Sequence, residues 1–134
     1  MPGPVQGSRV KVGARAEITR AFSSAEVADF ARLAGYAPDP TRVPGPLINA
    51  LFSYLLGMQL PGTGTNYLKQ ETRWLAEAAI GEPLTASVEI TRLRPDKQLV
   101  DLATSCLDQG GRLVAEGRAL VYVRDVSGGL REDG

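Results

Sequence analysis

Two side chains in a short proline-rich loop could exchange protons with a ligand. Tyr36 and Asp39 are three residues apart, and Asp39 lies between two prolines. A carboxylate can act as a general base and a phenol can donate a proton. We take Asp39 and Tyr36 as the candidate catalytic residues. The alternatives are that Asp39 is only a turn residue and that Tyr36 only covers an edge of the core.

Three further candidates lie just beyond this loop, where Gly45 is followed by proline and an apolar run. Glycine and proline suit the start of a helix. An amide N–H at a helix N-terminus can stabilise negative charge that develops on a ligand oxygen. Asn49 and Ser53 are four residues apart and so share one helix face. A buried amide and a buried hydroxyl need partners, and these are either a ligand or backbone groups. Gly45, Asn49 and Ser53 are the candidate substrate-binding residues.

The composition excludes several kinds of site. The 134 residues include no histidine and one cysteine, Cys106. A Ser-His-Asp triad is therefore impossible, and no zinc-binding pattern exists. No glycine-rich loop of a phosphate-binding type is present. We expect no metal and no bound cofactor, and we expect Cys106 to be a small core residue.

Charge and length indicate one globular domain. Lys plus Arg and Asp plus Glu number 15 each, so charge gives no reason to expect a nucleic-acid or membrane partner. No apolar run approaches the ~20 residues of a membrane span. A single cysteine fits a reducing compartment, and residues 1–8 lack the pattern of a signal peptide. We expect a cytoplasmic protein with one domain over 1–134 and flexible tails at 1–8 and 127–134.

Two helices are predicted around the loop. The first begins at Ser23, where Glu26 completes a capping box, and ends at Gly35 in the left-handed conformation. Its apolar face comprises Val27, Phe30, Ala31 and Ala34. The second begins at Gly45 and is apolar nearly all round, which is typical of a buried helix.

Five segments favour strands: 10–21, with a possible break at Gly13, 66–75, 83–92, 98–106 and 113–124. Short turns join the last three, so these form an antiparallel meander. A twisted sheet buries its apolar face best by wrapping around the second helix. This is an α+β hot-dog fold. Because sheet edges of this kind often pair between subunits, we expect a homodimer.

Several other side chains have ordinary structural explanations. We expect Trp74 to pack, and Glu71 and Arg73 to form a cross-strand pair or face solvent. Arg92, Arg94 and Lys97 flank a turn, where solvent exposure is the default and phosphate contact the alternative.

The order of three long stretches resembles the MaoC-like, or (R)-specific enoyl-CoA hydratase, family. The stretches are FSSAEVADFARLAG (22–35), PGPLINALFSYLLGMQLPGTGTNYLKQETRW (44–74) and IGEPLTASVEITRLRPDKQLVDLATSCLDQGGRLVAEGRALVYV (80–123). The resemblance implies a pocket for an acyl thioester of coenzyme A or acyl carrier protein. It also implies that Gly45 matches the glycine whose amide polarises the thioester carbonyl, and that Ser53 matches a serine beside the catalytic pair.

The chain departs from the family at the catalytic loop. The family pattern there is Asp-x-x-x-x-His, whereas this chain has GYAPDP at 35–40 and a shorter connection to the second helix. Pro44 stands where the family commonly has a histidine. Both catalytic positions are therefore lost or remade.

The resemblance with this departure allows three hypotheses. The first is a lyase acting on enoyl or β-hydroxyacyl thioesters, with Asp39 as the base. The second is a non-catalytic subunit that forms a heterodimer with a catalytic hot-dog chain. The third is a repurposed cyclase or isomerase that relies on positioning and oxyanion stabilisation.

Overall fold

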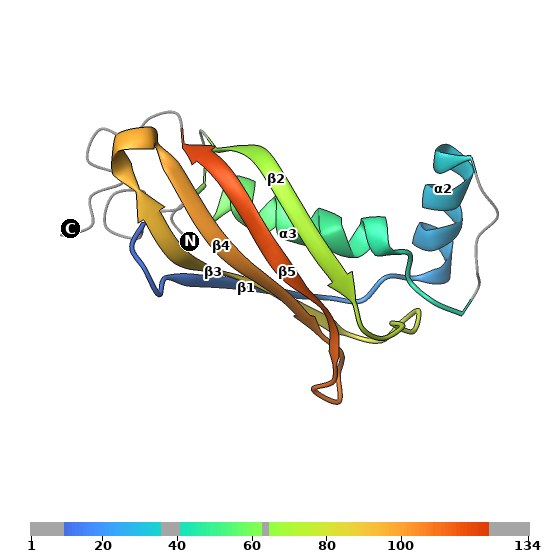
Figure 1. Ribbon diagram of the computed structural model, residues 1–134. Coiled ribbons are helices and arrows are strands. Elements are labelled where there is room, and N and C mark those ends of the chain that lie inside the picture. The colour runs from blue at the N-terminus through green and yellow to red at the C-terminus, as the bar shows by residue number, and fades with distance from the viewer. Residues whose placement is uncertain (1–9, 36–40, 63–64, 124–134) are drawn as a thin grey trace.

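The computed structural model describes residues 10–35, 41–62 and 65–123, which form one antiparallel sheet, two α-helices and a short 3-10 helix, η1 (Pro95–Lys97). In Figure 1 the long helix α3 (Gly45–Met58) runs along one face of the sheet, and α2 (Ser24–Ala34) lies at one end of the molecule. The expected tails at 1–8 and 127–134 lie outside the described residues.

The sheet contains five strands in the order β1-β3-β4-β5-β2. Their bounds are β1 Arg15–Arg20, β2 Thr65–Trp74, β3 Leu84–Arg94, β4 Leu99–Leu107 and β5 Leu113–Val123. All four neighbouring pairs are antiparallel. The predicted meander of β3, β4 and β5 is confirmed, and β1 and β2 form the two edges.

Helix α3 is the centre of the core, as its apolar sequence predicts. Its buried side chains lie on one face of the helix, at spacings of three and four residues: Ile48, Leu51, Phe52, Leu55 and Leu56. The burial is less complete than the apolar sequence predicts, since Tyr54 and Met58 on the other side are exposed. The buried side chains pack with the inward-facing side chains of the strands in one hydrophobic cluster, which also contains Cys106. Burial raises the pKa of the Cys106 thiol to about 11.

Helix α2 carries its own start and stop signals, also as predicted. The Ser23 hydroxyl accepts from the Glu26 amide at 3.1 Å, and the Ser23 amide donates to the Glu26 carboxylate at 2.9 Å. This backbone donation lowers the pKa of Glu26. Gly35 closes the helix with φ of +84°.

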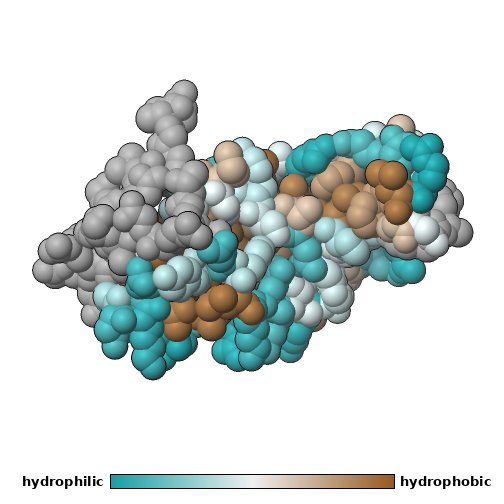
Figure 2. All heavy atoms as spheres, turned by 90° about the horizontal axis from the view of Figure 1, so that it is seen from above, coloured by the Kyte–Doolittle hydropathy of each residue, from teal (hydrophilic) through white to brown (hydrophobic). Residues whose placement is uncertain are grey.

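The predicted apolar face of α2 is only partly buried. Val27 and Ala31 are buried, but Ala34 is exposed because it lies in the last turn, beyond the body of the core. Leu33 is 84% exposed. Seen from above, hydrophobic and hydrophilic surface lie side by side at the α2 end of the molecule (Figure 2).

The first strand is shorter than the predicted segment 10–21. Gly13 adopts φ of +92° and its amide donates to the Ile90 carbonyl at 2.9 Å. This turn delays regular pairing with β3 until Arg15. The break suspected at Gly13 is therefore real, and β1 begins after it.

Candidate functional site

Helix α3 and the edge strand β2 meet along a row of small and polar side chains, which we call the α3–β2 seam. Its members on the helix are one turn apart, and its members on the strand point toward the helix. The seam comprises Gly45, Asn49 and Ser53 of α3 and Tyr67, Gln70, Thr72 and Trp74 of β2.

Asn49 is tied to the strand by two hydrogen bonds. Its side-chain oxygen accepts from the Gln70 amide group at 3.3 Å and from the Thr72 hydroxyl at 3.1 Å. Successive side chains of a strand point to opposite faces, so residues 70 and 72 lie on the same face of β2 and both reach Asn49. Because both bonds use the oxygen, the NH₂ group of Asn49 keeps its donors. No described residue accepts from them.

Ser53 lies one turn further along the seam. Its side chain is close enough to the Tyr67 hydroxyl to influence the pKa of that group. Burial raises the pKa of Tyr67, and the nearby Ser53 side chain offsets part of that rise. Ser53 is exposed, and it lies beyond Asn49 as seen from the helix start.

Gly45 begins α3 as predicted, and Trp74 packs directly against it. A Cβ atom added at position 45 would lie 2.9 Å from Cζ2 of the indole ring, so a larger side chain would displace the ring. The cap residue Pro44 supplies no side-chain hydrogen bond to the helix. The Gly45 amide is one of the four N–H groups that have no partner within a helix, and no other described residue accepts from it.

A cavity of about 610 Å³ opens at this end of the seam. It is lined by Arg42, Val43, Pro44, Gly45, Pro46, Ile48, Asn49, Trp74, Ala76, Glu77 and Ala78. Its size is that of a small-molecule site, and its walls are mostly apolar. The cavity therefore brings together Gly45 and Asn49, two of the predicted binding residues, and excludes Ser53. Tyr36 and Asp39 lie outside the described residues.

Three side chains that line this cavity were not among the residues predicted for the site. Trp74, expected only to pack, also forms a wall. Arg42 and Glu77 form an ion pair at the cavity, and Glu77 is the one carboxylate among its described lining residues. The segments that carry them meet through an isolated bridge between Arg42 and Ala79. No local sequence pattern predicts that long-range pairing.

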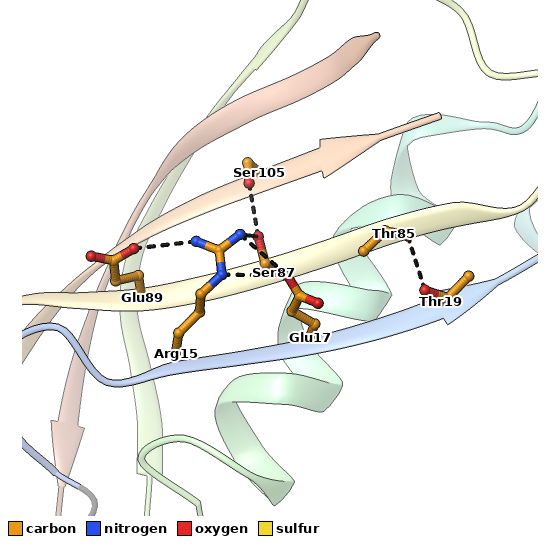
Figure 3. A network of polar contacts seen from close by, with 7 residues as sticks. All are labelled: Arg15, Glu17, Thr19, Thr85, Ser87, Glu89 and Ser105. Atoms are coloured by element: carbon orange, nitrogen blue, oxygen red, sulfur yellow. Dashed lines mark hydrogen bonds and ion pairs between the residues drawn. The ribbon is translucent and has the colours of Figure 1, made fainter. Parts of the chain in front are cut away.

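The outer face of the sheet has a second hollow, of about 430 Å³. Figure 3 shows the polar network beside it, in which Arg15 contacts Glu17, Glu89 and Ser87. Cross-strand ion pairs continue the pattern as Arg73–Glu116 and Arg118–Glu71. Both alternatives predicted for Glu71 and Arg73 are observed, since each side chain pairs with a charge of β5 and each is also exposed. These charges neutralise one another.

Neither a metal site nor a membrane span is found in the part of the chain that the structure describes. It contains no group of three or more His, Cys, Asp or Glu side chains placed to hold a metal ion. None of its helices has both the length and the apolar character needed to cross a bilayer.

Comparison with known proteins gives relatives over most of the chain. No protein-family model matched. A protein of Aeromonas caviae named (R)-specific enoyl-CoA hydratase is 40% identical over 126 positions, covering 84% of this chain and 94% of that protein. A protein of Methylorubrum extorquens named 3-hydroxybutyryl-CoA dehydratase is 31% identical, covering 85% of this chain and 81% of that protein.

The fold comparison agrees. The structure of the (R)-hydratase from A. caviae superposes with a TM-score of 0.77 at 38% identity, covering 84% of this chain and 96% of that one. The sequence alignment with the A. caviae relative also shows a difference in length. Since 84% of 134 residues is fewer than 126, this chain lacks some positions of that relative within the matched region.

Proposed function

The chain belongs to the MaoC-like, (R)-specific enoyl-CoA hydratase family of hot-dog proteins, and on this premise we propose that it binds an acyl thioester in the cavity at the start of α3. The observation that carries the proposal is the Gly45 amide. It lies at a helix N-terminus, lines the cavity and has no acceptor among the described residues. A thioester carbonyl placed there receives a hydrogen bond that strengthens as negative charge develops on its oxygen.

The remainder of the cavity suits the rest of such a ligand. Pro46, Ile48 and Trp74 offer apolar walls for an acyl group. Asn49 adds an N–H donor that its own hydrogen bonds leave available. We also propose that Ser53, which lies beside Tyr67 further along the seam, contacts the ligand.

Proton transfer is the part of the family chemistry for which this chain needs different side chains. The chain has no histidine, and it is shorter than its A. caviae relative within the matched region. We assign the base role to Asp39, with Tyr36 as donor, since both belong to the connection before α3. Glu77 is the competing carboxylate because it lines the cavity.

We further propose that the chain forms a dimer and that its acyl ligand is attached to a carrier. The unpaired side of β2 is available for pairing between subunits. Exposed apolar side chains lie on the same strand and on α3: Tyr54, Met58 and Leu68. The carrier is coenzyme A or acyl carrier protein, and a cytoplasmic location fits the free thiol of Cys106.

Trp74 provides the test, because it is the only tryptophan and it borders the cavity. Titration with butyryl-CoA is expected to change its fluorescence, and butyryl-pantetheine tests whether the nucleotide part of the carrier is needed. Turnover is followed through loss of the conjugated thioester absorbance of crotonyl-CoA. Hydration that Asp39→Asn abolishes and Glu77→Gln preserves supports the assigned base.

The other outcomes separate the hypotheses. Binding without hydration supports the non-catalytic subunit, and addition of a catalytic hot-dog chain then tests for a complex. Hydration lost in Glu77→Gln but kept in Asp39→Asn reassigns the base. A folded protein that binds no acyl thioester refutes the proposal.

A further inference from the structure

We propose that Asn49, Gln70 and Thr72 form a plug that restricts the cavity to short acyl groups. The inference rests on the proposed function and names the substrate class of the same site. Two observations support it: the position at which the cavity ends, and the hydrogen-bonded side chains found at that position.

The cavity extends along α3 only as far as Asn49. Its helix lining contains Gly45, Ile48 and Asn49, whereas Ser53, the next seam residue, is not part of it. At the point where it ends, Asn49 is bonded across the seam to both Gln70 and Thr72. Side chains of the helix and of the strand therefore close the seam one turn beyond Gly45.

Beyond this closure the seam continues to Tyr67, which is 38% exposed. Ser53 is exposed, and a Cβ atom added at Gly57 would meet nothing within 4 Å. The helix face beyond the plug is therefore less crowded than the face at Gly45, where the same addition would meet the Trp74 ring at 2.9 Å. Without the hydrogen bonds of the plug, an acyl chain that starts at Gly45 would continue toward Ser53 and Tyr67, which are exposed.

The plug discriminates by length because its hydrogen bonds are costly to break. A short acyl group leaves both bonds intact and can use the remaining N–H donors of Asn49. A longer chain must separate Asn49 from Gln70 and Thr72 and place methylenes beside their polar groups. Those groups are part-buried, so leaving them unpaired lowers the affinity.

The test compares acetyl-, butyryl- and octanoyl-CoA binding, followed by Trp74 fluorescence, in the wild type and two variants of one position. In the wild type, affinity is expected to rise from acetyl to butyryl and then to fall for octanoyl. Asn49→Ala removes the plug, and octanoyl-CoA is expected to bind roughly tenfold more tightly than in the wild type, which corresponds to about two newly buried methylenes.

Asn49→Leu is the matched variant, because leucine has a similar volume and no hydrogen-bonding group. It removes both hydrogen bonds but keeps the volume, so it is expected to relax the length limit less than Asn49→Ala does, while binding acetyl- and butyryl-CoA more weakly than the wild type. Thr72→Val removes one tether and keeps the shape of the side chain. It is expected to shift the preference toward octanoyl-CoA by a smaller factor, and it provides the test should Asn49→Ala not fold.

The failures are distinguishable. If affinity in the wild type rises steadily through octanoyl-CoA, or if neither Asn49→Ala nor Thr72→Val alters the length preference, the plug is refuted and the acyl-thioester proposal stands. If the folded wild type binds none of the three, both are refuted.

Discussion

The outer face of the sheet and the α3–β2 seam are both rows of polar side chains that join neighbouring elements, yet they are built from different chemistry. The outer face uses charge: Arg15, 47% exposed, is shared between Glu17 and Glu89 at 3.3 and 3.2 Å. The seam uses neutral groups that are part-buried, such as the amide of Asn49 and the hydroxyl of Thr72.

The comparison teaches that unpaired donors indicate a binding site better than the number of charges does. On the outer face each described carboxylate of the network has a guanidinium beside it, so little is left for a ligand. In the seam, Gly45 and Asn49 line an apolar-walled cavity, and each keeps an N–H donor that has no acceptor among the described residues. A ligand gains more from such a donor, because less water competes for it.

The largest effect on stability is expected at the contact between β2 and β5, because β2 carries side chains of both regions. A Cβ atom added at Gly117 of β5 would lie 1.9 Å from the Glu71 carbonyl oxygen of β2. Gly117→Ala must therefore displace the strand that carries both rows, and we expect it to lower the free energy of unfolding by more than ~4 kcal/mol. Urea denaturation followed by circular dichroism measures it.

Gly57→Ala is the matched control for this substitution, since an added Cβ meets nothing within 4 Å and the position is helical. It is expected to raise the stability by up to ~1 kcal/mol. Equal effects of the two variants would mean that the β2–β5 junction tolerates a shift, and that the two regions are not coupled through it.

Gly45→Ala is expected to act on the seam alone. The added Cβ meets the flexible Trp74 side chain and not backbone, so the stability falls by only ~1–2 kcal/mol. Displacement of the ring disturbs the cavity beside the amide, and butyryl-CoA binding is expected to weaken about tenfold, the equivalent of one good hydrogen bond. Unchanged affinity would remove Gly45 from the site.

Thr72→Val tests the energy of a neutral seam contact. Loss of the hydrogen bond to Asn49 is expected to cost ~1 kcal/mol of stability. Because no charge is involved, the cost should be the same at low and high salt. A strong dependence on salt would show that the seam, like the outer face, depends on charge.

Arg15→Met is expected to have the smallest effect on stability, and it tests the charged contacts of the outer face. The ion pairs of Arg15 are exposed, and Ser87, which is buried, keeps its hydrogen bond to Ser105 at 2.9 Å when the bond from Arg15 is lost. We expect a loss below ~1 kcal/mol that disappears in high salt, with butyryl-CoA binding unchanged. Weaker binding in this variant would give the outer hollow a role that its paired charges argue against.

Local signals in the sequence were sufficient for much of the fold. The capping box at Ser23, the left-handed Gly35 and the Gly-Pro start of α3 each act within a few residues, so their patterns predict them. The position of Gly45 and Asn49 at one cavity followed for the same reason, because the two residues are one helical turn apart. The family resemblance supplied the hot-dog arrangement, which the relatives confirm.

The remaining part depended on contacts between distant segments. Arg42 and Glu77 are brought together by the bridge between Arg42 and Ala79, and the partners of Asn49 are more than twenty residues away. Hydrophobic periodicity states which face of an element is buried but not which strand lies against it. Sequence reasoning therefore found the donors of the cavity and missed the partners that fix their orientation.

The helix boundaries on either side of the connection before α3 have a consequence for how this chain could have evolved. Gly35 ends α2 through a bond from its own amide to Ala31 at 2.9 Å, and Pro44 and Gly45 start α3 without a side-chain cap from elsewhere. Neither boundary depends on how many residues join them. The bridge between Arg42 and Ala79 fixes the end of the connection that lines the cavity. A change in length before Arg42 therefore costs the fold little, and an ancestral loop can be shortened there while the cavity at the start of α3 is kept.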